Sequence, residues 1–316
     1  MTGPAPFHGD VAGGPERVEA AWLRTRDGLR LRAATWPVDG ARGTVLLLPG
    51  RTEYVEKYAG LAGDLAEWGL STVSIDWRGQ GLSDRLLADP LSGHVNSFSD
   101  YQADLAALVD HATAAGMPKP WYLVAHSMGG AIGLRALIDG LTVERAVFSS
   151  PMWGISLSAA LRPAAWTLSY AARSFGFHDR YAPGTSKGAY QNAAAFEGNL
   201  LTHDQDQYAR MALQTERHPE LGLAGPSLGW LNEALVECRR LSRLSSPATP
   251  CLTFVGTEEL IVDTQRITER MATWRNGELL SVDGGRHECL METPKRRALV
   301  LDAMRRHLSA PAPVGS

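Results

Sequence analysis

The feature that most constrains the fold is a tight turn between an apolar strand and a helix within residues 121–137. The apolar run 121–124 leads into Ala-His-Ser-Met-Gly-Gly at 125–130, and a helical pattern follows directly. Strand and helix backbones pass close together at such a turn, so the residues two before and two after Ser127 must be small. Ala125 and Gly129 meet this requirement. The pattern predicts an α/β sheet with Ser127 raised above its edge.

A serine held in this way is typical of a nucleophile in acyl transfer. The turn aims the Met128 N–H and the start of the next helix at one spot, which favours a developing oxyanion. The simpler interpretation is a helix N-cap serine. That interpretation predicts nothing downstream, whereas a nucleophile requires an acid and then a histidine, each after a later strand.

The acid is expected after the buried-strand pattern at 250–255, which ends in Gly256. Glu258, Glu259 and Asp263 all lie near this strand end. The acid expected three residues after the glycine is Glu259, which leaves Glu258 in the solvent-facing loop. Asp263 then caps a helix that begins near residue 264.

The histidine is expected at position 287, on a glycine-rich loop after the short strand 279–282. In this mechanism neutral His287 accepts the Ser127 proton, and Glu259 holds the imidazole tautomer and stabilises the imidazolium. The chain order of serine, acid and histidine agrees with this assignment. The neighbouring His126 is excluded because its side chain is expected to point away from Ser127.

A second oxyanion donor is expected after the first strongly apolar strand, residues 43–48. We assign it to the backbone N–H of Arg51, acting with the N–H of Met128. The Arg51 guanidinium has two candidate partners, Glu53 and a ligand phosphate.

Strands and helices alternate from residue 44 onward, which predicts a mostly parallel eight-stranded sheet flanked by helices, with an antiparallel hairpin near Asp27-Gly28. Residues 16–150 and 227–309 form the expected core. Residues 151–226 lack strand patterns and are expected to be an inserted helical cap over Ser127. The Gly, Pro and Ala-rich segments 1–15 and 310–316 are expected to be disordered tails. The predicted elements are strands near 20–25, 29–36, 44–49, 71–76, 121–125, 144–149, 250–255 and 278–282, and helices near 54–68, 98–115, 128–139, 227–242, 264–274 and 292–308.

The first part of the expected cap is apolar and nearly uncharged. Trp153, Leu157 and Trp166 are the expected acyl contacts, and the alternative for each is packing of cap helices on the core. Gly154 and Pro163 interrupt the run and disfavour a membrane span, which leaves transient contact with a membrane surface.

Composition agrees with a globular enzyme of 316 residues with 44% hydrophobic content. The formal net charge is −3, whereas nucleic-acid-binding domains are typically basic, so we expect no binding to nucleic acid. The three cysteines lack metal-ligand spacing and indicate reduced thiols, so we expect no metal and no cofactor. The N-terminus lacks the features of a secretory signal, and we expect a cytoplasmic protein. The oligomeric state is left open.

Several longer motifs together resemble the bacterial lysophospholipase and monoacylglycerol lipase branch of the α/β hydrolases. They are Leu-Pro-Gly-Arg-Thr-Glu at 48–53, Lys-Tyr at 57–58, Asp-Trp-Arg-Gly-Gln-Gly-Leu-Ser at 76–83, 93–101, 125–130 and Gly-Arg-His-Glu at 285–288. The resemblance implies an α/β-hydrolase fold, the triad Ser127, Glu259 and His287, and an oxyanion hole of the Arg51 and Met128 N–H groups. It also implies a single-chain lipid ester as substrate, either a lysophospholipid or a monoacylglycerol. Pro49 and Glu259 replace a histidine and an aspartate that are commoner in the superfamily, and both replacements occur in the lysophospholipase-like members.

Two further functions stay open on the sequence. One is a carboxylesterase for small esters, and the other is a non-catalytic binding protein that keeps the fold and the pocket. A complete set of serine, acid and histidine favours an enzyme, and a serine at the turn disfavours chemistry that needs a carboxylate nucleophile there.

Overall fold

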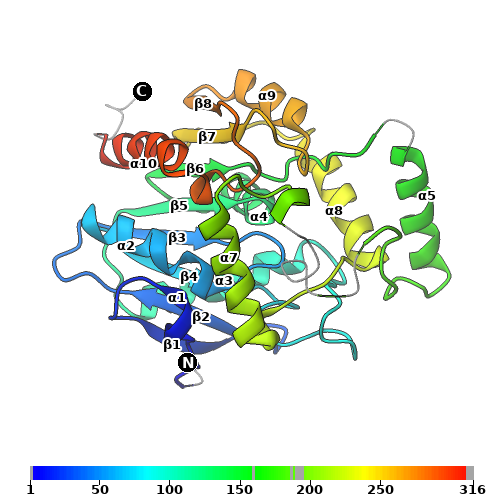
Figure 1. The fold of residues 1–316 in the computed structure, drawn as a ribbon, viewed down its shortest axis with the longest axis horizontal. Coiled ribbons are helices and arrows are strands. Elements are labelled where there is room, and N and C mark those ends of the chain that lie inside the picture. The colour runs from blue at the N-terminus through cyan, green and yellow to red at the C-terminus, as the bar shows by residue number, and fades with distance from the viewer. Residues whose placement is uncertain (1–2, 159–160, 186–187, 189–195, 311–316) are drawn as a thin grey trace.

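The computed structural model describes residues 3–158, 161–185, 188 and 196–310. Its centre is one eight-stranded sheet with the strand order β1-β2-β4-β3-β5-β6-β7-β8 (Figure 1). β1 pairs antiparallel with β2 and β2 with β4, and every later pair is parallel. This confirms the predicted mostly parallel sheet with an antiparallel hairpin at its start. The strands are β1 (Glu19–Arg24), β2 (Arg30–Trp36), β3 (Thr44–Leu48), β4 (Ser71–Ile75), β5 (Trp121–His126), β6 (Arg145–Ser149), β7 (Cys251–Gly256) and β8 (Gly277–Val282).

Both faces of the sheet are buried, and alternate residues of a strand serve different cores. Leu46 and Leu48 of β3 belong to a core formed with α3 (Asp100–Ala114), α4 (Met128–Ile138) and α9 (Thr264–Thr273). Val45 and Leu47 belong to the opposite core, which contains α2 (Ala59–Glu67) and α10 (Pro294–Ser309). Successive side chains of a strand point to opposite faces, so a strand covered on both sides must be apolar throughout.

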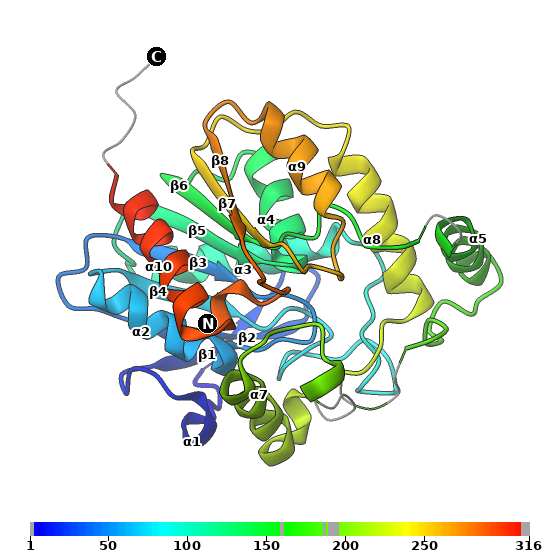
Figure 2. The ribbon, with the colours of Figure 1, turned by 45° about the horizontal axis from the view of Figure 1, so that its top comes forward.

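The segment between β6 and the next core helix, α8 (Leu228–Leu241), leaves the sheet. Its described regular elements are the helices α5 (Leu161–Ser174) and α7 (Gln205–Arg217) and the short 3₁₀ turns η2 (Phe196–Gly198) and η3 (Pro219–Leu221). Figure 2 shows α5 at the rim of the molecule with α8 between it and the sheet, and α7 on another side, near α1 (Gly9–Ala12). The division into core and cap at residues 151–226 remains our proposal.

The N-terminal segment corrects one expectation. Residues 3–15 are ordered against the core and do not form a tail: the Ala5 N–H donates to the carbonyl of Ala20, and Phe7 packs edge-on against Trp36. Val11 and Ala12 in α1 are buried. Composition alone predicted disorder because it does not show that these few apolar side chains find a surface on β2 and α2 to cover. Of the expected C-terminal tail, residues 311–316 lie outside the described part of the chain.

In the described part of the chain, no helix combines the length and hydropathy that a bilayer crossing requires.

Candidate active site

Ser127 occupies the turn between β5 and α4 in a strained backbone conformation. Its φ is +49°, in the left-handed region that residues with a side chain rarely adopt. Two backbone hydrogen bonds fix the turn to the end of β6 and the residues after it. The Ser127 N–H donates to Ser149 O at 3.0 Å, and the Ser127 carbonyl accepts from Met152 N at 2.8 Å. Strain of this kind persists only where the surroundings over-determine it, and it concentrates at functional sites.

The glycine after the turn brings α4 against the end of β3. A Cβ on Gly129 would lie 2.3 Å from the carbonyl oxygen of Leu48 and 2.5 Å from that of Pro49, so only glycine fits. Met128 is the first residue of α4, and the N–H groups of a helix's first turn have no partner within the helix. The close approach therefore places the Met128 amide beside the loop that carries Arg51.

Three buried side chains from different loops form a chain of hydrogen bonds. Nε2 of His287 lies 2.9 Å from Oγ of Ser127, and Nδ1 of His287 lies 2.7 Å from Oε2 of Glu259. All three residues are buried. A hydroxyl, an imidazole and a carboxylate at these distances can transfer the hydroxyl proton to the ring while the carboxylate stabilises the resulting charge.

The second carboxylate oxygen of Glu259 is held by backbone. Oε1 accepts the N–H groups of Ile261 at 2.6 Å and Val262 at 3.1 Å. Burial alone favours the neutral carboxyl, but His287 and these N–H groups outweigh it and lower the pKa of Glu259. Glu259 is therefore an anion fixed in orientation at neutral pH.

The other two candidate acids lie elsewhere, as expected. Oε2 of Glu258 lies 3.1 Å from Nε2 of His203, and its side chain is 55% exposed. Asp263 caps α9, where its carboxylate accepts the Arg266 N–H at 3.3 Å. The offset from Gly256 thus selected the acidic residue that contacts His287.

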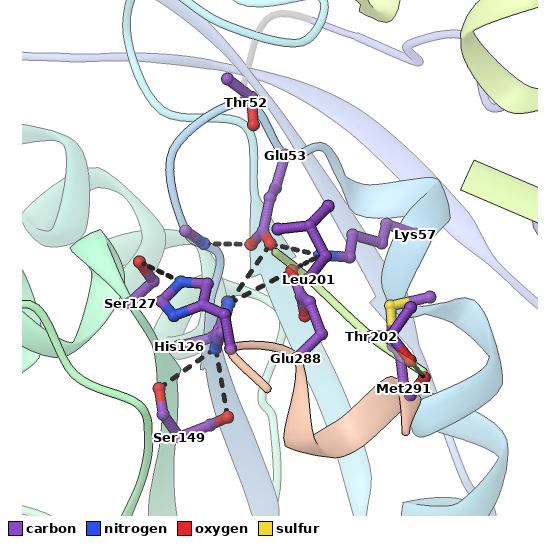
Figure 3. A network of polar contacts seen from close by, with 12 residues as sticks. Thr52, Glu53, Lys57, His126, Ser127, Ser149, Leu201, Thr202, Glu288 and Met291 are labelled. Atoms are coloured by element: carbon purple, nitrogen blue, oxygen red, sulfur yellow. Dashed lines mark hydrogen bonds and ion pairs between the residues drawn. The ribbon is translucent and has the colours of Figure 1, made fainter. Parts of the chain in front are cut away.

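A buried ionic cluster of Glu53, Lys57, His126 and Glu288 lies next to these side chains. Nζ of Lys57 contacts Oε1 of Glu53 and lies 2.5 Å from Oε1 of Glu288. Nε2 of His126 lies 3.3 Å from the same Glu288 oxygen, while its Nδ1 lies 3.1 Å from Ser149 O. Figure 3 shows these four side chains turned toward one another beside Ser127. The His126 ring lies 4.8 Å from that of His287, and its polar contacts are with Ser149 and the acidic residues of a cluster that we did not predict.

The cluster also holds the loop after β3. Oε2 of Glu53 accepts the Gly50 N–H and the Tyr58 hydroxyl, and Nε2 of Gln80 donates to Gly50 O at 2.9 Å. These bonds fix the backbone on which the Arg51 N–H sits. The sequence indicated this role only indirectly, because all four residues of the cluster fall within the motifs of the family resemblance.

Glu53, His126 and Glu288 come close enough together to serve as ligands for a metal ion. The Lys57 ammonium contacts both carboxylates and already supplies the positive charge there. With two carboxylates and one ammonium, a protonated His126 makes the cluster neutral. Burial favours neutral His126, but Glu288 and Glu53 outweigh it and raise its pKa. The residues therefore fit an ion-pair network better than a metal site.

Ser127 opens into a cavity of about 580 Å³, a size typical of small-molecule sites. Most of its wall is apolar, and its polar lining includes Arg51, Ser127 and His287. The apolar lining comes from five stretches of the chain: Met152, Ile155, Leu200, Leu201, Met211, Pro226, Trp230, Leu231, Leu260, Ile261 and Val262.

The structure corrects the expectation that Trp153, Leu157 and Trp166 contact the acyl chain, because none of them lines the Ser127 cavity. They line a separate cavity of about 220 Å³ on the other side of Ile155. Trp153 is a core residue, because its Nε1 donates to Gly130 O at 3.1 Å and its ring packs 5.2 Å from that of Phe148. Trp166 lies on α5, which packs on α8 away from Ser127. An apolar segment does not reveal from its sequence which of two cavities it faces.

Comparison with known proteins supports the same assignment of fold and class. A family model described as serine aminopeptidase, S33, matches residues 39–294. Lysophospholipase L2 of Escherichia coli (strain K12) is 37% identical over 270 residues, covering 82% of this chain and 78% of that protein. The chain belongs to the family of α/β hydrolases that this family model describes. Among solved structures, a monoglyceride lipase from Saccharomyces cerevisiae matches with a TM-score of 0.72 at 20% identity, covering 96% of this chain and 99% of that one.

Other relatives point to the same group. A probable lysophospholipase L2 from Haemophilus influenzae is 30% identical over 283 residues, covering 89% of this chain and 88% of that protein. A carboxyl esterase from Bacillus coagulans shares the fold, with a TM-score of 0.73 at 13% identity over 93% of this chain and 98% of that one. The chain is thus a carboxylic ester hydrolase that resembles lysophospholipases and monoacylglycerol lipases.

Proposed function

We propose that this enzyme hydrolyses carboxylic esters of single-chain lipids, lysophospholipids or monoacylglycerols, through an acyl-enzyme on Ser127. One observation carries the proposal. The hydrogen-bonded chain from Ser127 through His287 to Glu259 opens into a cavity whose walls are mostly apolar. The names of the lysophospholipase relatives agree with this substrate class.

In the first step, Oγ of Ser127 attacks the ester carbonyl carbon while Nε2 of His287 takes its proton. The tetrahedral oxyanion is stabilised by the backbone N–H groups of Arg51 and Met128. The C–O bond to the glycerol part then breaks, and His287 returns the proton to the leaving alkoxide. Water, deprotonated by His287, attacks the acyl carbon; the bond from this carbon to Oγ of Ser127 then breaks, the fatty acid leaves, and His287 returns the proton to Oγ. Glu259 stays ionised throughout and stabilises the imidazolium.

The cap that we place at residues 151–226 supplies one wall of the cavity through Ile155, Leu200, Leu201 and Met211. The acyl chain lies along these side chains in our proposal. Leu260 and Leu200 are 62% and 38% exposed at this cavity, so apolar surface continues from the lining to solvent. We propose that this rim makes transient contact with lipid surfaces. The three cysteines are buried and unpaired, which fits the reducing cytoplasm that we propose for the protein.

The test begins with a fluorophosphonate probe, which forms a covalent adduct with an activated serine. Labelling of the wild type, and none of Ser127→Ala, supports the nucleophile; absence of labelling in folded wild type leaves a non-catalytic binding protein. A panel then compares a lysophospholipid, a monoacylglycerol, p-nitrophenyl acetate and an amino-acid arylamide by kcat/KM. Turnover of acetate alone indicates a small-ester carboxylesterase. Preference for the arylamide indicates the peptidase activity named in the family description.

A further inference from the structure

Arg51 lines the Ser127 cavity, and its guanidinium has no counter-ion among the described residues. Its Nη2 donates to the carbonyl of Ala224 at 2.7 Å, and its Cζ lies 5.1 Å from the centre of the Trp230 ring. Its Nε is buried and has no hydrogen-bond partner among the described residues. The side chain is thus held in place by neutral groups and keeps unused donor capacity.

No carboxylate of the described residues forms an ion pair with Arg51, and the segments outside the described part of the chain contain neither Asp nor Glu. Glu53 and Glu288 line the same cavity, but Lys57 binds both of them. Of the two candidate partners of the Arg51 guanidinium, Glu53 therefore pairs with Lys57 instead. Charges taken out of water are normally paired, so an unpaired arginine among the residues that line a cavity indicates an anionic ligand. Burial lowers the pKa of Arg51 to about 10, since only the tyrosines Tyr101 and Tyr181 oppose it.

We propose that the Arg51 side chain is an anion subsite that binds the phosphate of a lysophospholipid while the ester lies at Ser127. This rests on the proposed function and selects lysophospholipids over monoacylglycerols within it. The reach of the side chain agrees with this placement. The backbone nitrogen and the guanidinium carbon of arginine are separated by as many bonds as the ester carbonyl carbon and the phosphorus of a 1-acyl lysophospholipid. One residue then contacts the oxyanion through its N–H and the phosphate through its guanidinium.

A purely structural role for the guanidinium is the alternative, because its bond to Ala224 ties the loop before α8 to the loop after β3. Losing such a tie impairs all substrates alike. Losing a phosphate contact impairs only substrates that carry a phosphate. The ratio of kcat/KM for two lipids with the same acyl chain separates these roles.

The first experiment compares 1-decanoyl lysophosphatidylcholine with 1-decanoylglycerol, both below their micelle-forming concentrations. Arg51→Met lowers the lysophospholipid to monoacylglycerol ratio by about 10- to 100-fold, the usual effect of losing one hydrogen bond to a charged group. Arg51→Lys keeps a positive charge and recovers part of the ratio. An unchanged ratio in Arg51→Met overturns the proposal.

Arg85 offers a matched control. It is also largely enclosed, and its guanidinium donates to the backbone carbonyls of Gly79 and Gly81, outside the Ser127 cavity. Arg85→Met leaves the substrate ratio unchanged, whatever it does to stability. A similar fall in the ratio for Arg85→Met would show a general response to losing an enclosed arginine and would contradict the assignment to Arg51.

The second experiment uses the wild type, and its main comparison does not depend on whether Arg51→Met folds. Glycerol 3-phosphate competes with a p-nitrophenyl ester in the wild type, and glycerol at the same concentration and ionic strength does not. Equal effects of the two compounds overturn the proposal. Inhibition by inorganic phosphate together with an unchanged lipid ratio in Arg51→Met means that the subsite takes free phosphate, and also overturns it. Absence of turnover for every ester refutes the proposed function instead.

Discussion

The Glu259 carboxylate lies 2.7 Å from Nδ1 of His287 and is held on its other oxygen by two backbone N–H groups. Its neighbour in sequence, Glu258, is exposed and paired with His203. Because one glutamate is buried against His287 and its neighbour is exposed, substituting each in turn tests which of them orients the imidazole.

Glu259→Gln is expected to lower kcat by about 10³- to 10⁴-fold with the fold retained, because the imidazole loses its orienting anion. Glu258→Gln is the matched control and is expected to stay within about twofold of wild type. Steady-state kinetics with circular dichroism of both variants provide the measurement. A comparable loss of kcat in folded Glu258→Gln or folded Asp263→Asn would refute the choice of Glu259.

Ser127→Ala and His287→Ala are each expected to lower kcat by several orders of magnitude. The double variant is expected to be little worse than either single one, since a nucleophile and its base act as one unit. The double-mutant cycle on a single soluble ester measures this coupling. Additive losses would mean that the 2.9 Å contact between the two side chains is not used in the reaction.

The stability of the buried cluster is expected to depend on pH through His126. Its pKa is raised in the folded state, so protonated His126 contributes stability that is complete below the ordinary value of about 6.5 and is lost as the pH rises through the folded pKa. His126→Gln is therefore expected to cost about 3 kcal/mol near pH 5.5 and less at pH 9. Urea unfolding at both pH values measures the difference.

His307 provides a control of opposite sign. Burial and Arg145 lower its pKa to about 4, so the folded state resists protonation while the unfolded chain accepts it. Wild type then loses stability through this group between about pH 6.5 and pH 4, and His307→Gln removes that loss. The variant is expected to gain relative to wild type as the pH falls, whereas His126→Gln is expected to lose. Parallel pH profiles for the two variants would contradict both assignments.

Ester specificity is expected to rise with acyl chain length until the apolar cavity is full. Each buried methylene contributes about 0.8 kcal/mol, close to fourfold in binding that persists to the transition state, so medium chains exceed acetate by at least about 100-fold in kcat/KM. A series of p-nitrophenyl esters measured below micelle-forming concentrations gives the profile. A maximum at acetate would refute an acyl-binding role for the cavity.

Leu201→Trp, which fills part of this cavity, is expected to move the optimum to shorter chains. The matched control is Leu157→Trp in the separate cavity beyond Ile155, which is expected to leave the optimum in place. The reverse outcome would restore Leu157 as an acyl contact.

The alternation of apolar strands and helices could be predicted from the sequence, because each element is determined by residues within its own segment. A strand covered on both faces needs a continuous apolar run, as in β3, and the predicted strand bounds agree with the structure to within one or two residues. The turn at Ser127 could be predicted in the same way. Gly129 is required because the helix that begins after the turn packs directly against the end of β3. Glu259 and His287 followed from their place after particular strands.

Contacts between distant segments decided the rest. The sequence could not show that Glu53, Lys57, His126 and Glu288 share one buried cluster, because they come from three segments far apart in the chain. It could not show that Phe7 and Val11 find cover, or that Trp153 turns into the core while Met152 beside it lines the Ser127 cavity. Periodicity and turn chemistry fix what a segment becomes, whereas the side that each residue faces depends on packing between segments far apart in the chain.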